Sequence, residues 1–395
     1  MNLSQLEEAF LPYDKKLLAQ ERLRRFLGVK EVDRPTYEQY IIGPIERFDR
    51  RKNAFATLMP DNPFGEEFRK RFKARTGYDS REPLPYSELE PEDRIGQSLS
   101  SAAGRLCREY SPDALPITPP EGRVEITDQA WMSRLIKKVA LLFGAEMVRI
   151  TKVDQRWVYQ DIDIPHKYAI VIVVHHLRSF NDTAPSHLSG MVGGDTYSKL
   201  KFITTRLADF ICGLGYDAAY RETLGAKTEM LVVPTAIDAG VGEFARNGRV
   251  LSPEFGINMR IKLVTTDLPL EVDKPISFGV HEFCMDCENC ATYCPANAIP
   301  FGPPTDTLPG IYNNPGFRKW YINAERCLTF WSINRRKWTS CGGRCIAVCP
   351  WNKPLVPLHN MVRWVAIHSP TVVKKILVWS DQKMYGRKKE NRTFR

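Results

Sequence analysis

Eight of the ten cysteines of this chain lie in two groups near its C-terminal end. The first group reads CMDCENCATYCP over residues 284–295, so four thiols fall within eleven residues and a proline follows the last. The spacing C-x₂-C-x₂-C-x₃-C-P is that of bacterial ferredoxins with two clusters, in which three thiolates of one short loop bind one cubane. The fourth cysteine of such a run binds the other cluster. The chemistry expected here is the transfer of single electrons.

The second group ends in the same way but is more widely spaced. Its cysteines are Cys327, Cys341, Cys345 and Cys349, and Pro350 follows the last of them. The ferredoxin crossover predicts two [4Fe–4S] clusters. One would be held by Cys284, Cys287, Cys290 and Cys349, and the other by Cys327, Cys341, Cys345 and Cys294.

Three alternatives compete with two clusters. Disulfides are disfavoured, because cysteines at x₂ spacing pair poorly and no secretion signal is visible. Zinc would favour two separated C-x₂-C pairs. A single cluster with spare thiols stays open. The remaining cysteines, Cys107 and Cys212, are interpreted as ordinary buried residues.

Upstream of the cysteines, helical and strand patterns alternate. A helix is predicted over 127–144, with Thr127 as N-cap, Gly144 as its end and an apolar stripe at Trp131, Leu135, Val139 and Leu142. A second helix is predicted over 196–214, with its stripe at Leu200, Ile203, Leu207, Ile211 and Leu214. Apolar runs at 147–153, 168–176 and 259–268 predict strands. The alternation indicates an α/β (α+β) layer.

Composition fits a soluble globular protein of several domains, with 395 residues, 43% hydrophobic and 26% charged. The longest apolar run, 168–177, is too short to span a bilayer. The sequence RRFL at 24–27 resembles a twin-arginine export motif, but EVDRPTYEQY follows, so a solvated helix face is expected. The expected location is therefore cytoplasmic, with peripheral membrane association left open. The net charge of +10 suits an anionic partner or cofactor, and no nucleic-acid motif accompanies it.

Composition shifts divide the chain into four expected regions. Residues 1–120 are expected to wrap a core with irregular structure and short helices, and 121–280 to form the α/β domain. Residues 281–355 would be the two-cluster module, and 356–395 a basic C-terminal extension.

Several long stretches together resemble one family. AIDAGVGEFARNGRVLSPEFGINMRIKLVTTDLPLEVDKPISFGVHEFC (236–284), the double cysteine motif, and segments 123–148, 156–160 and 44–55 are similar to corrinoid-dependent reductive dehalogenases. Epoxyqueuosine reductase is the nearest other family. Thirteen residues separate Cys327 from Cys341, which is the dehalogenase arrangement, although the x₃ gap before Cys345 differs from the x₂ usual in that family.

The resemblance implies a nitroreductase-like domain that binds cobalamin base-off and a ferredoxin-like module behind it. No D-x-H-x-x-G motif supplies a histidine as lower ligand. Dehalogenases of this family use two electrons and one proton to replace halogen by hydrogen in an organohalide. The implied partners are the organohalide, a separate low-potential donor such as a ferredoxin or flavodoxin, and a small membrane-anchor protein.

The resemblance also implies residues for the chemistry. Tyr197, in DTYSKL, matches the family's proton donor, and Lys227 and Arg260 match its supporting polar residues. Two cations beside a phenol favour its anion, which makes the group chemically sensible. Trp331 matches an aromatic residue near the substrate. Taken singly, each residue has an ordinary structural interpretation, and His175 and His176 are interpreted as core histidines.

Two other functions stay open. The first is a cobalamin and iron–sulfur reductase of a non-halogenated substrate, as in epoxyqueuosine reductase. The second is an iron–sulfur subunit that transfers electrons without catalysis.

Overall fold

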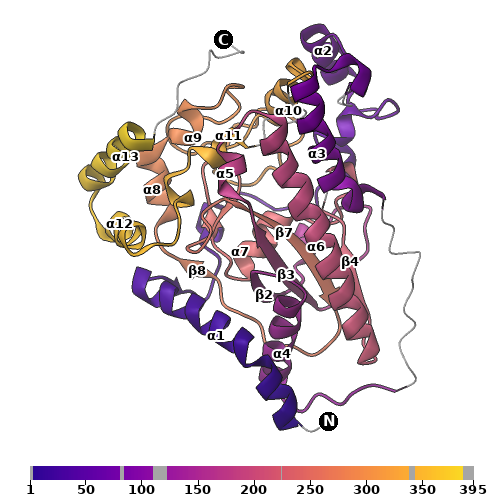
Figure 1. Ribbon diagram of the computed structural model, residues 1–395, viewed down its shortest axis with the longest axis vertical. Helices are drawn as coiled ribbons and strands as arrows, with labels where there is room; N and C mark the ends of the chain where they lie inside the picture. The colour runs from indigo at the N-terminus through magenta and orange to yellow at the C-terminus, as the bar shows by residue number, and fades with distance from the viewer. Residues whose placement is uncertain (1–2, 81–83, 110–121, 224, 338–342, 386–395) are drawn as a thin grey trace.

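A computed structural model describes residues 3–80, 84–109, 122–223, 225–337 and 343–385. Figure 1 shows helices packed around a central sheet. The helices are α1 Leu3–Leu27, α2 Glu66–Thr76, α3 Pro91–Glu109, α4 Gln129–Leu142, α5 Arg178–Asn181, α6 His187–Gly213, α7 Val232–Asp238, α8 Val280–Cys287, α9 Asn289–Thr292, α10 Ala324–Ile333, α11 Arg344–Ala347, α12 Pro357–His368 and α13 Thr371–Tyr385. The strands are β1 Lys30–Glu31, β2 Met147–Lys152, β3 Tyr168–His175, β4 Ala218–Arg221, β5 Glu243–Phe244, β6 Val250–Leu251, β7 Met259–Thr266 and β8 Ile276–Ser277.

The central sheet has the strand order β2–β3–β7–β4, and every neighbouring pair is antiparallel. Its three longer strands are the apolar runs predicted from sequence, so the mixed α/β fold is confirmed. The interior of β3 is buried throughout because helices cover both faces of the sheet. The short β4 was not predicted, since four residues carry too little alternation to identify a strand.

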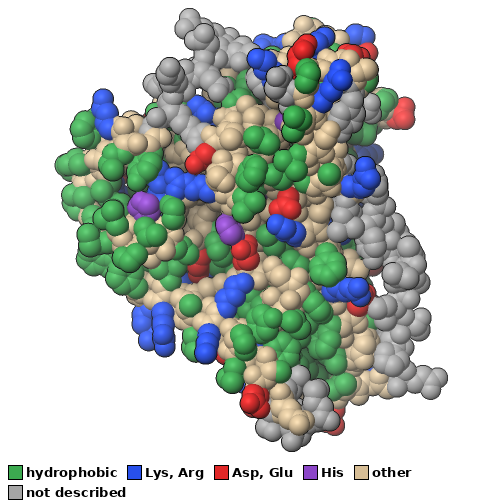
Figure 2. All heavy atoms as spheres, viewed as in Figure 1, with side chains coloured by type: hydrophobic (Ala, Val, Ile, Leu, Met, Phe, Trp, Pro, Cys, Tyr) green, Lys and Arg blue, Asp and Glu red, His purple; other side chains and the backbone are tan. Residues whose placement is uncertain are grey.

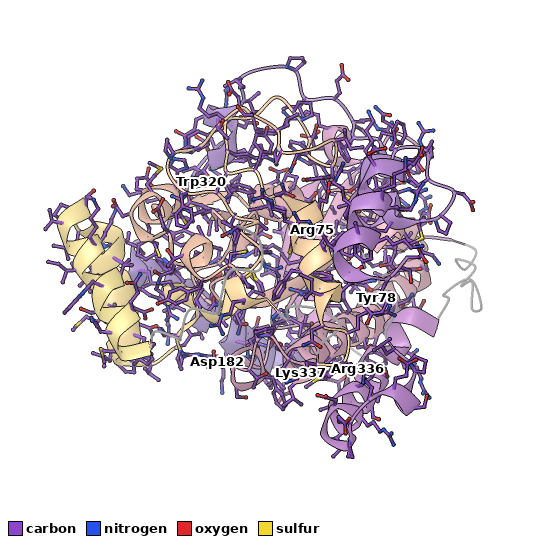
Figure 3. The ribbon with its side chains drawn as sticks, turned by 90° about the horizontal axis from the view of Figure 1, so that it is seen from above. Arg75, Tyr78, Asp182, Trp320, Arg336 and Lys337 are labelled. Atoms are coloured by element: carbon purple, nitrogen blue, oxygen red, sulfur yellow. The ribbon has the colours of Figure 1, made fainter. Side chains whose placement is uncertain are left out.

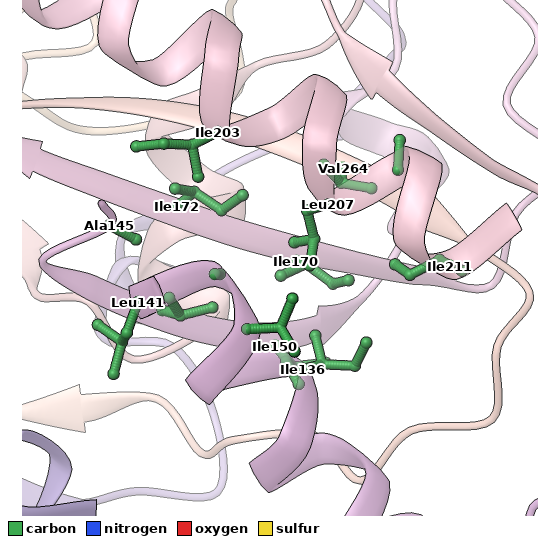
Figure 4. Packing of buried hydrophobic residues seen from close by; sticks show 14 of the residues in the cluster. Ile136, Leu141, Ala145, Ile150, Ile170, Ile172, Ile203, Leu207, Ile211 and Val264 are labelled. Atoms are coloured by element: carbon green, nitrogen blue, oxygen red, sulfur yellow. The ribbon is translucent and has the colours of Figure 1, made fainter. Parts of the chain in front are cut away.

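One face of the sheet is covered by α4 and α6. Ile150, Ile170 and Val264 point from three strands into an apolar core that includes Ile136 of α4 and Leu207 of α6 (Figure 4). The other face packs on α7, with Trp157 and Ile237 in a second core. The apolar stripe predicted for α6 is confirmed, because its first four members are fully or almost fully buried.

The start of α6 differs from the prediction. The helix begins at His187, where Ser186 and Ser189 form a reciprocal capping box, and not near residue 196. Tyr197 therefore lies inside the helix and not at its head. Gly193 and Gly194 also lie inside α6, and close packing explains Gly194. A Cβ atom at Gly194 would lie 3.0 Å from Cα of Gly104 in α3, which runs beside α6 in Figure 1.

The start of α4 also differs from the prediction. Asp128, and not Thr127, is the N-cap, and its carboxylate accepts a hydrogen bond from the backbone N–H of Trp131. The buried stripe includes Met132 and Ile136, whereas Leu142 is 51% exposed. Residues one position away from the buried face of a helix have the same helical spacing, so periodicity alone could not determine which face of α4 is buried.

The N-terminal region contains longer helices than expected. The helix α1 has 25 residues although Pro12 lies inside it, and α3 has 19. The expectation of a solvated face at 24–27 holds for Arg25 and Phe26 but is wrong for Arg24 and Leu27, which are buried. Arg24 Nε lies 2.5 Å from Glu254 Oε1, and its Nη1 donates to the carbonyl of Gly240. This buried ion pair holds α1 against the sheet domain.

The C-terminal extension forms two helices, α12 and α13, beside α8 (Figure 1). Their outer face carries many exposed apolar side chains, which Figure 2 shows as a green area on the left. These are Leu358, Met361, Trp364, Val372, Ile376, Trp379 and Met384. In the described part of the chain, no helix has both the length and the apolar character needed to cross a bilayer.

Candidate functional site

Four thiols line one small cavity between α8, α9 and the segment before Pro350. They belong to Cys284, Cys287, Cys290 and Cys349. The chain can turn between α8 and α9 because Glu288 adopts a left-handed conformation, with φ of 49°. These four residues are the set that the crossover predicts for the first cluster.

Cys284 is buried and the other three cysteines are half-buried, and the four thiols lie close enough to influence one another. Burial raises the pKa of Cys284 to about 11. Burial and then the neighbouring thiols also raise the pKa of the other three members of this cavity.

Three members of the second predicted set also pack together. Cys294, Cys327 and Cys345 lie around one apolar core with Phe330, and the backbone N–H of Ala298 donates to Cys294 Sγ at 3.4 Å. Cys341 lies outside the described residues. Among the described side chains, no three or more of His, Cys, Asp and Glu are placed to hold a single metal ion.

Tyr197 and Arg260 lie together on the α6 side of the sheet. Arg260, the second residue of β7, pairs with Val174, and its Cζ lies 5.5 Å from the centroid of the Tyr197 ring. Gly193, one turn before Tyr197, faces this guanidinium, and a Cβ there would make an ordinary contact 3.7 Å from Arg260 Nη2. The structure thus brings together two of the three residues predicted for the proton chemistry.

His176 lies beside this pair, although the sequence suggested only a core role. It is 1% exposed, and its Nδ1 lies 3.1 Å from Asn181 Nδ2. Its Nε2 has no hydrogen-bond partner among the described residues. Burial, and then the positive charges of Arg260 and Arg249, lower its pKa well below the usual range. His176 is therefore a neutral imidazole next to two arginines.

Lys227 lies elsewhere, exposed on the 3₁₀ turn Gly225–Lys227. No hydrogen bond or ion pair of the described residues links it to Tyr197 or Arg260. The lysines that share their faces are Lys201, one turn after Tyr197 on α6, and Lys262, two residues after Arg260 on β7. Both are buried and approach Glu222, whose Oε1 lies 3.1 Å from Lys262 Nζ.

Trp331 lies on α10, half-buried between two apolar cores. Its ring centroid is 5.8 Å from that of Phe55. It also packs in the same core as Cys327 and Cys294. Trp331 therefore contacts core residues and cysteines, and its position near a substrate remains a prediction.

A larger cavity of about 370 Å³ opens on the α7 side of the sheet. Its wall is largely aromatic and includes Tyr37, Tyr40, Trp157, Tyr159, Phe244, Phe317 and Tyr321. Lys319 lies among these rings, with Nζ 4.9 Å from the centroid of Tyr321, and burial lowers its pKa to about 8. Asn313 Oδ1 and Asn314 Nδ2 are buried there without hydrogen-bond partners among the described residues. Neither Tyr197 nor Arg260 is part of this wall.

One short turn connects the four-thiol cavity, the aromatic cavity and the strand that carries Arg260. Residues 245–249 join β5 to β6. Arg246 and Asn247 line the four-thiol cavity, and Gly248 lines the aromatic cavity. Arg249 donates to the carbonyl of Met259, next to Arg260. The guanidinium of Arg246 lies 4.6 Å from the ring centroid of Trp320, which Figure 3 labels.

The sequence contains this turn as ARNGR, within a stretch that resembles dehalogenases. Nothing in its spacing indicated that consecutive residues face different cavities. The roles of Arg246 and Asn247 were therefore missed.

Comparison with solved structures defines the class of fold. The catabolic reductive dehalogenase NpRdhA matches with a TM-score of 0.70 and 24% identity, over 93% of this chain and 50% of that chain. The same dehalogenase in complex with 3-bromo-4-hydroxybenzoic acid matches with a TM-score of 0.68. A family model described as a 4Fe-4S dicluster domain matches residues 283–353. The chain therefore has the reductive dehalogenase fold with a dicluster domain near its C-terminal end.

Comparison with curated proteins identifies its relatives. The tetrachloroethene reductive dehalogenase of Sulfurospirillum multivorans is 29% identical over 318 residues, which are 71% of this chain and 61% of that protein. The one from Dehalobacter restrictus is 33% identical over 58% of this chain and 50% of that protein. Epoxyqueuosine reductase of Atelocyanobacterium thalassa is 27% identical over 29% of this chain and 35% of that protein. The resemblance is confirmed: the chain is related to reductive dehalogenases, and spans between half and two thirds of these two dehalogenases.

Proposed function

We propose that this chain is an oxidoreductase that removes halide from an organohalide. The observation that carries the proposal is the cavity lined by Cys284, Cys287, Cys290 and Cys349, within a fold that matches reductive dehalogenases. The overall change is R–X + 2 e⁻ + H⁺ → R–H + X⁻. Two [4Fe–4S] clusters would carry the electrons one at a time, the first held by these thiols and the second by Cys327, Cys341, Cys345 and Cys294.

The proposed second cofactor is a base-off corrinoid, and the aromatic cavity supports part of its site. A corrinoid has a flat ring with amide side chains at its edge, and when bound it supplies the low-potential cobalt that reduces the carbon–halogen bond. Aromatic walls suit such a ring, and the unpaired atoms of Asn313 and Asn314 suit its amides. The ring and its appendages are larger than this cavity, so we assign the cavity to a part of the cofactor only.

In this proposal the proton of the reaction comes from a side chain of the protein. Tyr197 O–H donates the proton that replaces halogen, and Arg260, over its ring, stabilises the phenolate that is left. Lys227 has an exposed ammonium, which makes it available to an anionic group of a substrate. Trp331 would form part of the wall of the substrate site.

Two partners belong to the proposal. A separate low-potential protein, such as a ferredoxin or flavodoxin, would supply electrons. A small membrane-anchor protein would bind the chain, and the exposed apolar face of α12 and α13 supports a hydrophobic partner.

The decisive experiment is anaerobic reconstitution with iron, sulfide and hydroxocobalamin, followed by a halide-release assay with a chemical reductant. Tetrachloroethene and 3-bromo-4-hydroxybenzoic acid represent the compounds named with the relatives. Halide release that depends on both cofactors supports the proposal. Retained cofactors without halide release from any alkyl, alkenyl or aryl halide would instead favour a reductase of a non-halogenated substrate, as in the related epoxyqueuosine reductase, or an electron-transfer subunit.

A further inference from the structure

The side-chain amide of Asn247 is buried beside the four thiols with neither polar atom paired. Asn247 is 8% exposed and lines the same cavity as Cys284, Cys287, Cys290 and Cys349. Among the described residues, neither its Nδ2 nor its Oδ1 has a hydrogen-bond partner. A buried polar group without a hydrogen-bond partner destabilises the folded state. The amide therefore needs a partner within the cavity.

The backbone around Asn247 is fixed on both sides. The N–H of Ala245 donates to the carbonyl of Arg249, and the N–H of Gly248 donates to the carbonyl of Ala245, both at 2.9 Å. Gly248 has φ of +75°, and a Cβ there would lie 3.0 Å from Ile322. This tight turn leaves the Asn247 side chain little freedom to leave the cavity.

Arg246 ties the turn to the helix that carries the first thiols. Its Nε and Nη2 donate to the carbonyl of Cys284 at 3.0 and 2.9 Å. Its Nη1 donates to the carbonyls of Pro300 and Gly302, both at 2.9 Å. Asn247 is therefore held in a fixed position relative to the cysteine ligands.

The chemistry of the cavity decides which atom of Asn247 is used. An asparagine amide offers two N–H donors on Nδ2 and one acceptor oxygen. Cysteine thiolates and the sulfides of an iron–sulfur cluster are acceptors only. We propose that Asn247 Nδ2 donates a hydrogen bond to a sulfur of the cluster held by the four thiols, and thereby raises the reduction potential of that cluster. This inference rests on the proposed function, because a cluster must occupy the cavity.

The direction follows from electrostatics. A donated hydrogen bond withdraws electron density from sulfur and stabilises the reduced cluster, which carries one more negative charge. Asn247 is thus a positioning residue that acts through the cluster, and it makes the first cluster easier to reduce than it would otherwise be.

The test uses the reconstituted chain and the variant Asn247→Leu, which keeps the side-chain shape but removes the donor. Potentiometric titration followed by electron paramagnetic resonance measures both clusters in the same sample. We expect the first cluster to become about tenfold harder to reduce at a fixed potential, equivalent to a shift of about 59 mV in the negative direction for one electron. The second cluster should keep its potential.

Asn181→Leu is the matched control. Asn181 is buried but does not line the four-thiol cavity. Its amide contacts His176 and Asn258, so its replacement also perturbs the interior, and both cluster potentials should stay unchanged. A proton that couples to the first cluster and is lost on exchange into D₂O should be present in Asn181→Leu and absent from Asn247→Leu.

Several results would overturn the inference. They are an unchanged potential in Asn247→Leu with full iron content, and an equal shift of both clusters. If Asn247→Leu fails to bind iron, Asn247→Ala, which also removes the donor, is titrated in its place and should show the same negative shift. An alanine variant that also fails to assemble the cluster would make the residue structural. Wild-type protein with about four iron atoms or none would instead count against the proposed function itself.

Discussion

The guanidinium of Arg260 lies over the phenol ring of Tyr197, with its Cζ 5.5 Å from the ring centroid. The contact joins the second residue of β7 to the interior of α6. In the proposed reaction, Arg260 stabilises the phenolate that remains after Tyr197 has given up its proton.

Tyr197→Phe should therefore lower halide release by about 10²–10⁴-fold, the usual worth of a general acid. Only a hydroxyl is lost, so iron and cobalt contents should not change. The assay is single-turnover halide release with chemically reduced enzyme. Retention of more than about half the wild-type rate, with chemistry rate-limiting, would show that Tyr197 is not the acid.

Lys227→Gln should discriminate between substrates by charge. A charged hydrogen bond is worth about 1.5–3 kcal/mol, so KM for 3-bromo-4-hydroxybenzoic acid should rise about tenfold or more. Turnover of neutral tetrachloroethene should stay the same, and so should the melting temperature, because the side chain is exposed. Equal effects on both substrates, or on neither, would contradict a substrate-binding role.

Cysteine variants should fall into two spectral classes. Cys349→Ala should lose the same cluster as Cys284→Ala, and Cys294→Ala the same cluster as Cys327→Ala. Iron and sulfide analysis should give about eight of each in wild-type protein, as two [4Fe–4S] clusters require. Cys212→Ala, within α6, serves as the control with full content. A Cys294→Ala spectrum matching that of Cys284→Ala would contradict the crossover.

Arg24→Leu should destabilise the protein by about 3–5 kcal/mol, because it leaves the buried carboxylate of Glu254 without its partner. Arg25→Leu, on the exposed side of the same helix, should have little effect. The double variant Arg24→Leu/Glu254→Leu should recover part of the loss. Apparent melting temperatures measured at one heating rate provide the comparison. A single variant as stable as wild type would mean that the ion pair does not hold α1.

Asp238 should make stability depend on pH. Burial raises the pKa of its carboxyl to about 6, while Tyr37 and Trp157 donate to it. Because the folded pKa lies above the unfolded one, the folded state holds an extra proton between about pH 4 and 6. Its contribution to the free energy of unfolding should fall by up to about 3 kcal/mol as pH rises through this range, and stay constant above it.

Asp238→Asn should remove that part of the slope. Asp33→Asn, at a carboxyl that is 92% exposed, is the control and should keep it. Melting temperatures measured in parallel between about pH 4 and 7 test the difference. A slope that is identical in wild type and Asp238→Asn would contradict the raised pKa.

The sequence predicted the long elements well because their signals are local. The strand β3 is a continuous apolar run, β2 and β7 are rich in apolar and β-branched residues, and the second half of α6 has an apolar stripe. The start of α6 could not be predicted in the same way. Glycine is unfavourable inside a helix, and only the close approach of α3 shows why Gly194 lies inside α6.

The cysteine spacing predicted which thiols gather, since short loops constrain their own geometry. Contacts between distant segments were not predictable from local patterns. Arg24 looked like a surface residue because its partner, Glu254, lies in another part of the sequence. Asn247 gave no signal at all, because its importance comes from a cavity that the turn after β5, α8 and the segment before Pro350 form together.

The four-thiol cavity also constrains the order of events during synthesis of the chain. Three of its thiols leave the ribosome with α8 and α9, but the fourth, Cys349, follows only after α10 and α11. A nascent chain that has not reached this residue exposes three thiols without the wall that shields them. Completion of the cavity must then be a late step, and chains that stall before it would present reactive sulfur to the surrounding solution.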